Sequence, residues 1–417
     1  MKKVILGFLA TAFLVLVFAE ESYGIPAFSR KYKTSCSTCH YAAPMLNGFG
    51  KAFKNNGYRY PAGTDPEMTK EEPVSLGSEA YKKVWPDAIW PADIPGTSPV
   101  SVWAVGRINY AALSDVKWEF EIPHEVEILY AGTIGENFSF FGEVELENED
   151  NATEIAFPFA LQYDENPGLH FRMGMVHADP TPNHLKLTRN HYNIASFRSR
   201  NGWRFRDEQV GLEVWGAGNG SGERGGFTYR LGVVNGQGLS DMNKEKDFYG
   251  KATYKIGGLG EIGGTEGAGS EVSEFFIDDN VTLGAFMYTG TASSNTAVAD
   301  EDFTVYGGDV DFWYKRFILN GALMLMDSRI TGTPKRKSMV YYAQANAVLY
   351  PWLIGLLRYE WEDRDTGQDL VKPVNAIIPG ITLMARANVK LMLEFKKFLD
   401  EANKKNDTFG FQINFGF

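Results

Sequence analysis

The feature that most constrains this chain is a series of strand-like segments from residue 100 to the C-terminus. Stretches that alternate apolar with polar residues, or are rich in β-branched and aromatic residues, recur sixteen times and end at Phe417. Bacterial outer-membrane barrels have an even number of strands, joined alternately by short turns and long loops. We therefore predict an all-β fold, a 16-stranded outer-membrane β-barrel over 100–417, with strands at 100–110, 119–131, 138–148, 154–163, 169–178, 209–217, 227–235, 248–256, 281–290, 303–314, 317–327, 339–349, 352–362, 376–385, 389–399 and 408–417.

Composition agrees with a barrel and excludes some other classes. Aromatic residues make up 14% of the chain and there are 44 glycines, as expected for many strands and turns. A mean hydropathy of −0.25 does not fit a helical membrane protein, whereas barrel strands are apolar on one face only. The net charge of −11 argues against nucleic-acid binding. A soluble β-sandwich or propeller is the alternative, but no blade repeat is visible.

The N-terminus has the features of an export signal. Lys2 and Lys3 precede an apolar run over 4–19, and Ser22 and Gly24 place small residues before a cleavage site. We predict a signal peptide over 1–24 and a protein of the bacterial cell outer membrane, in contact with its lipid. The alternative is an uncleaved anchor helix, for which the run is short.

The sharpest motif is Cys-Ser-Thr-Cys-His at 36–40, which uses both cysteines of the chain. Two thiols one helical turn apart can bond covalently to the two vinyl groups of one haem, and the adjacent histidine then becomes the proximal iron ligand. We predict one covalent haem c held by Cys36, Cys39 and His40. The alternative is a redox CxxC pair, which would be expected beside a βαβ unit that this chain lacks.

A small helical haem domain is expected over 25–61. Pro44 is placed to open a helix and Gly57 to end it, with an apolar stripe between them that should pack against the haem. The sixth iron ligand is left open: Met68, Met45, a histidine of the barrel, or no protein ligand. Met45 is close in sequence to His40 and has the spacing of a core residue.

Charge predicts that this domain docks on the barrel. Segment 25–61 has six basic residues and no acid, so its formal charge is +6, and 62–417 carries −17. The two are joined by a proline-rich segment, 62–99, that reads as an extended linker. We expect the domain to lie inside the barrel or at its periplasmic mouth.

One barrel wall is predicted to be acidic. A hairpin that turns at 135–137 places Glu125 opposite Glu147 and Glu127 opposite Glu145, all facing the lumen toward its outer end. Seven carboxylates then converge: Glu119, Glu121, Glu125, Glu127, Glu143, Glu145 and Glu147. Basic residues of other strands, metal cations such as Fe(II), or the basic haem domain are expected to offset them.

Histidines elsewhere are weaker candidates. The connection 179–208 carries an arginine cluster and is expected to fold into the lumen as a constriction loop. A metal role for His177, His184 or His191 is a less ordinary alternative. His124 falls on the lipid-facing register unless Pro123 marks a bulge. His170 has the pattern of a structural residue. The connection 257–280 is unusually long and glycine-rich for the side of the short turns.

The first part of the chain resembles the fused outer-membrane monohaem cytochrome c–porins. The resemblance rests on Pro26–Arg30, Cys36–His40, Pro44, Leu46–Asn47, Gly50, Phe53–Lys54 and Gly57–Tyr58. It implies a haem c domain fused to a 16-stranded barrel, with His40 as proximal ligand and the two cysteines as thioether sites. Members from iron-oxidising bacteria oxidise extracellular Fe(II) and pass electrons to a periplasmic cytochrome c.

Two classes of function follow. The first is an electron conduit, an oxidoreductase of the iron:cytochrome c type that oxidises extracellular Fe(II) or another donor. The same parts would also serve electron export to an external acceptor. The second is a transport porin whose haem domain gates the pore or senses redox state. No Walker loop or second CxxCH is present, and the haem would carry the chemistry.

Overall fold

The computed structural model describes residues 26–417, apart from 78, 88–92, 116, 150–151, 177, 180, 182–188, 191, 206–208, 237, 239–242, 265–276, 294–298 and 368–371. The predicted signal peptide lies outside the described residues. Among these residues, no helix is long and apolar enough to cross a membrane.

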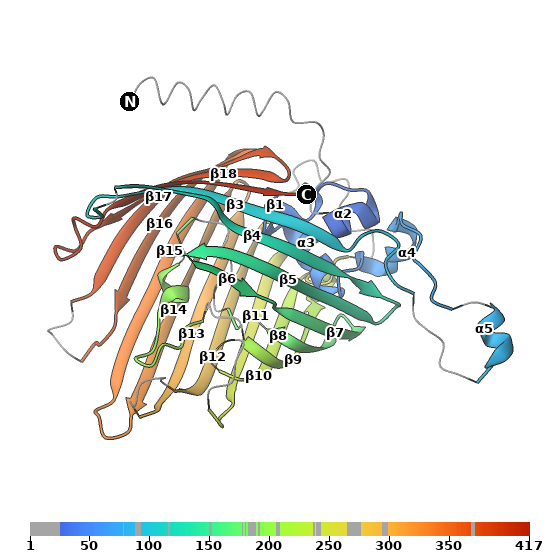
Figure 1. Cartoon of the computed structure of the whole chain (residues 1–417), viewed down its shortest axis with the longest axis horizontal. Helices are drawn as coiled ribbons and strands as arrows, with labels where there is room; N and C mark the ends of the chain where they lie inside the picture. Colours follow the sequence, from blue (N-terminus) through green and yellow to red (C-terminus); the bar gives the residue numbers. More distant parts are fainter. Residues whose placement is uncertain are drawn as a thin grey trace.

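A closed antiparallel barrel makes up most of the molecule (Figure 1). Each strand pairs with the next along the chain, and the last strand closes the barrel by pairing with the first. The strands are β3 Val100–Ala111, β4 Trp118–Ile134, β5 Phe138–Glu149, β6 Ala152–Ala156, β7 Phe159–Asn166, β8 Leu169–Val176, β9 Gln209–Asn219, β10 Arg224–Val234, β11 Asp247–Leu259, β12 Asn280–Ala292, β13 Glu301–Tyr314, β14 Phe317–Ile330, β15 Arg336–Tyr350, β16 Leu353–Asp363, β17 Val374–Arg386, β18 Val389–Phe398 and β19 Thr408–Gly416.

The predicted number of strands is confirmed, with one interruption. Both β6 and β7 pair with β5, so they are two parts of one strand and the barrel has sixteen. Pro158 lies at the break, where a residue without an amide hydrogen cannot continue the ladder. All sixteen predicted segments overlap a strand of the structure.

The outer surface of the barrel is apolar. Large side chains such as Leu231, Leu283 and Ile381 are at least half exposed there. Their neighbours along each strand point into the lumen and include many polar residues. Period-2 alternation in the sequence therefore separates a lipid-facing surface from a polar interior, as in outer-membrane barrels.

Connections at the two ends differ in length. One end has two- and three-residue turns, at 135–137, 167–168, 315–316, 351–352 and 387–388. Short turns face the periplasm in barrels of this type, so we call this end the periplasmic mouth. The connection between β11 and β12 is the predicted exception on this side, and Glu261 in its described part contacts Asn55 of the N-terminal segment.

The N-terminal residues fold inside the periplasmic half of the barrel. Residues 26–68, which we call the plug, comprise α2 Pro26–Tyr32, the 3₁₀ turn η1 Cys36–Thr38, the short strands β1 His40–Ala42 and β2 Met45–Leu46, α3 Gly48–Asn55, the turn η2 Pro61–Gly63 and α4 Asp65–Met68. Tyr41, Ala42 and Met45 pack against lumen-facing residues of β13, β14, β15 and β16. The prediction that the N-terminal domain lies inside the barrel is thus confirmed.

Two local predictions in this region were wrong. Pro44 does not open a helix: it lies in the tight connection between β1 and β2, and α3 starts four residues later after the N-cap Asn47. The linker 62–99 is not simply extended, because it contains α4 and α5 Glu79–Val84, and an antiparallel bridge joins Val74 to Ile94. The N-cap of α3 is set by the side chain of Asn47 and not by Pro44.

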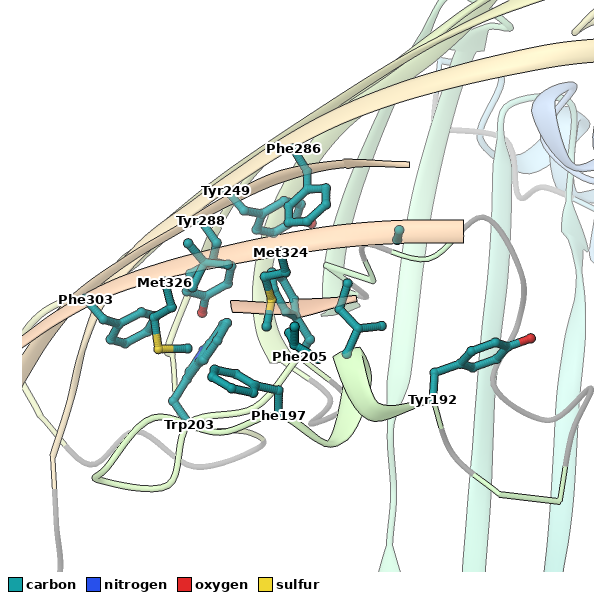
Figure 2. Close-up of a cluster of buried hydrophobic side chains, with 14 of the residues drawn as sticks. Tyr192, Phe197, Trp203, Phe205, Tyr249, Phe286, Tyr288, Phe303, Met324 and Met326 are labelled. Atoms are coloured by element: carbon teal, nitrogen blue, oxygen red, sulfur yellow. The ribbon is translucent and has the colours of Figure 1, made fainter. Parts of the chain in front are cut away.

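The outer half of the lumen is occupied by the connection between β8 and β9, which contains the helical turn α6 Asn193–Ser196. Its aromatic residues pack on lumen-facing side chains of β11 to β15 to form an apolar core inside the barrel (Figure 2). Trp203 is central, with ring centroids 4.6 Å from Tyr288 and 4.5 Å from Phe303. The predicted infolded loop is confirmed for the described part of 179–208.

Candidate functional site

The CxxCH segment forms a compact turn that is fastened to helix α3. Cys36 to Thr38 form a 3₁₀ turn, and the Ser35 side chain accepts a hydrogen bond from the amide of Ser37. Asn47 joins the turn to the helix: its Oδ1 accepts from the Gly50 amide at 2.8 Å, and its Nδ2 donates to the carbonyls of Ser37 and Thr38. One asparagine therefore caps α3 and fixes the motif.

Gly50 permits the close approach of α3 to the motif. A Cβ atom at this position would lie 2.1 Å from the carbonyl oxygen of Cys39, a distance that no side chain tolerates. Gly57 ends the helical segment with φ +67°, and a Cβ atom there would meet the carboxylate of Asp164 on β7. The predicted role of Gly57 as a helix stop is confirmed.

His40 has the hydrogen bonding of a metal ligand. Its Nδ1 lies 3.0 Å from the carbonyl oxygen of Pro44, which fixes Nδ1 as the protonated nitrogen and leaves Nε2 as the donor atom. Iron- and zinc-ligating histidines are commonly oriented by such a contact. Burial lowers the pKa of His40 to about 4, so the imidazole is neutral, the form that binds iron.

Buried hydrogen-bond donors without partners surround this turn, which fits the binding of haem. Tyr41 Oη, Trp103 Nε1 and Trp313 Nε1 are buried and have no hydrogen-bond acceptor. Haem carries two propionates, which are strong acceptors. Lys390 of β18 also reaches the turn and donates to the carbonyl of Ala43 at 2.8 Å. The two cysteines, a preoriented histidine and these donors match the needs of a covalently bound haem.

The predicted apolar stripe forms the plug's own aromatic core. Phe53 is buried and contacts Phe28, Tyr32 and Tyr58 edge to face. Burial, with Cys39 and Asp65 close by, raises the pKa of Tyr60. Tyr60 belongs to the same core, because its ring contacts those of Tyr32 and Phe53.

The candidates for a sixth iron ligand have different surroundings in the structure. Met45 is buried in the cluster that includes Trp313, so its side chain packs against the barrel as a core residue. Met68 ends α4 and is partly exposed. Among described histidines of the barrel, His124 and His170 contact carboxylates. The histidines of 177–191 lie outside the described residues. Met68 as distal ligand stays a prediction.

Ion pairs anchor the plug to the barrel. Arg59 lies 3.1 Å from Asp164, and Lys51 lies 3.3 Å from Asp311 of β13. Asn55 donates to the carbonyl and carboxylate of Glu261, in the long connection at the periplasmic mouth. These contacts confirm the predicted docking of a basic domain on an acidic barrel, and Glu261, in the described part of the long connection, takes part in it.

The predicted acidic wall has the expected register. Glu125 lies opposite Glu147 and Glu127 opposite Glu145 across β4 and β5. Oxygen atoms of Glu125, Glu127 and Glu145 lie within 4.8 Å of one another, and the first two side chains are buried. The cluster lies near the middle of β4 rather than toward the outer end.

The acidic wall lies next to the plug. Trp103 of β3 is the cross-strand partner of Glu127, and it packs against Ala43 of the plug together with Leu129. One tryptophan thus separates the turn after His40 from the carboxylate cluster. Sequence reasoning missed this relationship because Trp103 carries no motif.

His124 faces the lumen. The register of β3 and β4 shifts between Val105 and Arg107, so the bulge at Pro123 is confirmed. His124 Nδ1 lies 2.7 Å from Glu121, and its Nε2 lies 3.2 Å from Glu147 and next to Arg107. The imidazole is part of the acidic wall.

A cleft of about 490 Å³ opens between the plug and the turns of the periplasmic mouth. Tyr60 of the plug forms part of its wall, and Glu136 and Glu165 of the turns form another. The cleft therefore lies between the last part of the plug and the turns of the periplasmic mouth.

The infolded loop is held by carboxylates that the sequence did not single out. Glu394 accepts from the amides of Arg189 and Asn190 at 2.8 and 2.9 Å. Glu301 lies 3.3 Å from Arg200, and the buried Arg358 lies over the ring of Tyr192. The arginine cluster predicted an infolded loop, but its partners are spread over distant strands.

No family model and no curated protein matches this sequence. The fold is similar to that of solved outer-membrane proteins. OmpT from Vibrio cholerae, in its trimer form, matches with a TM-score of 0.53 and 9% identity, over 77% of this chain and 99% of that one. An anion-selective porin from Comamonas acidovorans matches with a TM-score of 0.50 and 13% identity, over 77% and 100%. The barrel of this chain thus has the fold of these outer-membrane proteins.

Proposed function

We propose that this protein transfers electrons across the outer membrane, by oxidising extracellular Fe(II) and reducing a periplasmic cytochrome c. The observation that carries the proposal is the position of the CxxCH turn, which is fastened inside the periplasmic half of a membrane barrel. A bilayer core of about 30 Å is an insulator, and a redox centre within the barrel shortens the gap across it.

The residues of this chain would hold the group in place. Cys36 and Cys39 would bind haem c covalently, and His40 Nε2 would ligate its iron, with Pro44 fixing the imidazole. Haem so bound supplies reversible one-electron chemistry. The buried indole N–H groups of Trp103 and Trp313, which have no acceptor, would suit the propionates.

Each side of the plug offers a fitting approach. On the lumen side, the carboxylates next to Trp103 favour cations, which suits Fe(II) as donor. On the periplasmic side, a cleft beside Tyr60 opens between the plug and the turns of the periplasmic mouth. The two faces fit a donor from outside and an acceptor in the periplasm.

The test is anaerobic stopped-flow mixing of the purified, oxidised haem protein with Fe²⁺, followed at the reduced-haem absorption band. We expect reduction by Fe²⁺ at micromolar to millimolar concentration. The control is Cys36→Ala with Cys39→Ala, which should lack covalent haem and show no band. Complete reduction by dithionite with none by Fe²⁺ would overturn iron oxidation and leave electron export.

A transport porin gated by the haem domain is the competing function. The plug and the infolded loop fill successive parts of the lumen, and both are held by buried ion pairs. This arrangement favours a closed conduit. Single-channel recording separates the two functions, because a transport porin conducts ions and a closed conduit does not.

A further inference from the structure

The segment between the plug and β3 forms an arm at the periplasmic mouth. We call residues 71–97 the arm, of which 78 and 88–92 lie outside the described residues. Val74 and Ile94 join its two sides, because the amide of each donates to the carbonyl of the other, at 2.9 and 3.1 Å. Figure 1 shows α5, which belongs to the arm, standing clear of the barrel. The arm is therefore a folded projection rather than a slack linker.

The base of the arm lies on the outer face of the barrel wall. Thr133 of β4 faces the lumen, where it accepts a hydrogen bond from Lys31 of the plug at 3.2 Å. Its neighbour Gly132 therefore faces outward, because successive residues of a strand point to opposite faces. A Cβ atom on Gly132 would lie 3.1 Å from Pro95 of the arm and 3.0 Å from the ring of Phe140. The chain thus passes from the lumen, around the rim, to the surface that faces lipid.

The rim from which the arm emerges carries the side chains of a lipid–water boundary. Tyr350 and Trp352 flank one periplasmic turn; both are exposed, and their rings stack with centroids 5.2 Å apart. Tyrosine and tryptophan are enriched at this level of membrane proteins, because their rings are apolar and their polar atoms reach water. The periplasmic turns therefore mark the inner surface of the membrane, and the arm starts there.

The far part of the arm exposes side chains of the same kinds. Val84 and Trp85 are 61% and 60% exposed, and Leu76 is more than half exposed. Lys82 and Lys83 directly precede them. Apolar residues and tryptophan beside lysines are typical of segments that lie in the membrane interface. At such a boundary the apolar atoms leave water, and the lysine ammonium groups stay hydrated.

We propose that the arm lies on the inner leaflet of the outer membrane and inserts Leu76, Val84 and Trp85 into the lipid–water boundary. Lipid is the partner because the base of the arm is continuous with the lipid-facing wall of the barrel, through Pro95 and Gly132. Acidic residues outnumber lysines in the arm, so apolar burial and not charge provides the attachment. Since the arm is tethered at the rim, attachment is intramolecular and needs little affinity.

Attachment of the arm to lipid also bears on the plug. The plug ends at Met68 and β3 begins at Val100, so the arm is most of the chain that joins them. An arm held on the leaflet shortens the free part of this chain, which keeps a released plug close to the mouth. The lipid contact thus adds to the ion pairs that hold the plug in the barrel.

The experiment attaches a nitroxide to Val84→Cys in the full chain, in nanodiscs of phosphatidylcholine. EPR then measures how strongly oxygen, which dissolves in lipid, and a water-soluble nickel chelate relax the label. The matched control is Leu113→Cys, in the connection between β3 and β4 at the outer end, because Leu113 is also 61% exposed. We expect a higher ratio of oxygen to nickel relaxation at position 84 than at position 113. Wild-type protein labelled in the same way gives the background from Cys36 and Cys39.

Two results at position 84 would overturn the proposal. A ratio equal to that at position 113 would show that the arm lies in water. Low relaxation by both reagents would show that protein covers the arm, either a second copy of this chain or a periplasmic partner.

A second set of variants tests the residues that insert. A label on Leu76→Cys should have the relaxation ratio of a lipid site, and Val84→Ser with Trp85→Ser in the same chain should lower that ratio to the value at Leu113→Cys. An unchanged ratio would contradict the role of Val84 and Trp85. The heat-dependent gel shift of folded barrels first shows that each variant assembles.

Discussion

The carboxylate of Asp164, at the periplasmic end of β7, lies 3.1 Å from Arg59 Nη1 of the plug. The same carboxylate contacts Nδ1 of His170 at 2.7 Å, and His170 stacks on Trp215. The Nε2 of His170 lies 3.1 Å from the Asn55 carbonyl of α3. Asp164 therefore holds the plug at two points: it contacts Arg59 directly, and it orients His170 against the Asn55 carbonyl.

Replacement of Asp164 should weaken the docking of the plug on the barrel. Asp164→Asn keeps the shape but removes the charge, so the mostly buried Arg59 loses its carboxylate and keeps only carbonyl oxygens as partners. Loss of one partner of a buried ion pair costs about 3 kcal/mol, so amide exchange of α3 should become about a hundredfold faster by mass spectrometry. Asp302→Asn, an exposed change at the outer end of β13, is the matched control. Unchanged exchange in Asp164→Asn would contradict this role.

Gly50→Ala should prevent haem attachment. The added Cβ atom would clash with the Cys39 carbonyl oxygen, so α3 or the CxxCH turn must move. We expect the variant barrel to assemble but to lack haem stain on a denaturing gel. Gly367→Ala, in an exposed loop where a Cβ meets nothing closer than 3.6 Å, should keep normal stain. Full haem content in Gly50→Ala would show that the turn does not need this contact.

The sequence predicted the barrel well because strand alternation and turn chemistry are local signals. The register of Glu125 with Glu147 followed from one short turn. The CxxCH motif is a local signal as well, since its residues are contiguous, and the haem that it predicts stays a prediction. The contact of Trp103 with Ala43 was not readable, because it joins two segments through tertiary packing. Pro44 was misread because a proline in a tight connection looks like a proline at a helix start.

The docking of the plug should strengthen as pH rises above 7. Burial, with Arg230 and Arg172 nearby, lowers the pKa of Lys54 to about 7. In a released plug this lysine would titrate near 10.4. The released state therefore binds more protons between these values, so docking gains up to about 1.4 kcal/mol per pH unit there. Below pH 7 Lys54 is charged in both the docked and the released plug, so the docking free energy no longer changes with pH through this residue.

The pH dependence of plug docking is measured as the protection factors of α3 amides against hydrogen exchange from pH 6 to 9, corrected for intrinsic exchange. Lys54→Met should remove the rise, because the titrating group is gone. Lys33→Met removes an exposed lysine of the same segment and should keep it. A flat profile in the wild-type protein would contradict the role of Lys54.

Ion conductance should appear only when both the plug and the infolded loop are loosened. The infolded loop is held by the aromatic core around Trp203 and by Glu301 with Arg200. Trp203→Ala removes about 3–5 kcal/mol of buried packing, but the plug still blocks the periplasmic half. Asp164→Asn loosens the plug, but the loop still blocks the outer half. We expect closed traces in planar bilayers for the wild-type protein and each single variant, and openings in the combined variant. Steady conductance in the wild-type protein would mean that neither the plug nor the infolded loop closes the lumen. It would favour transport over electron transfer.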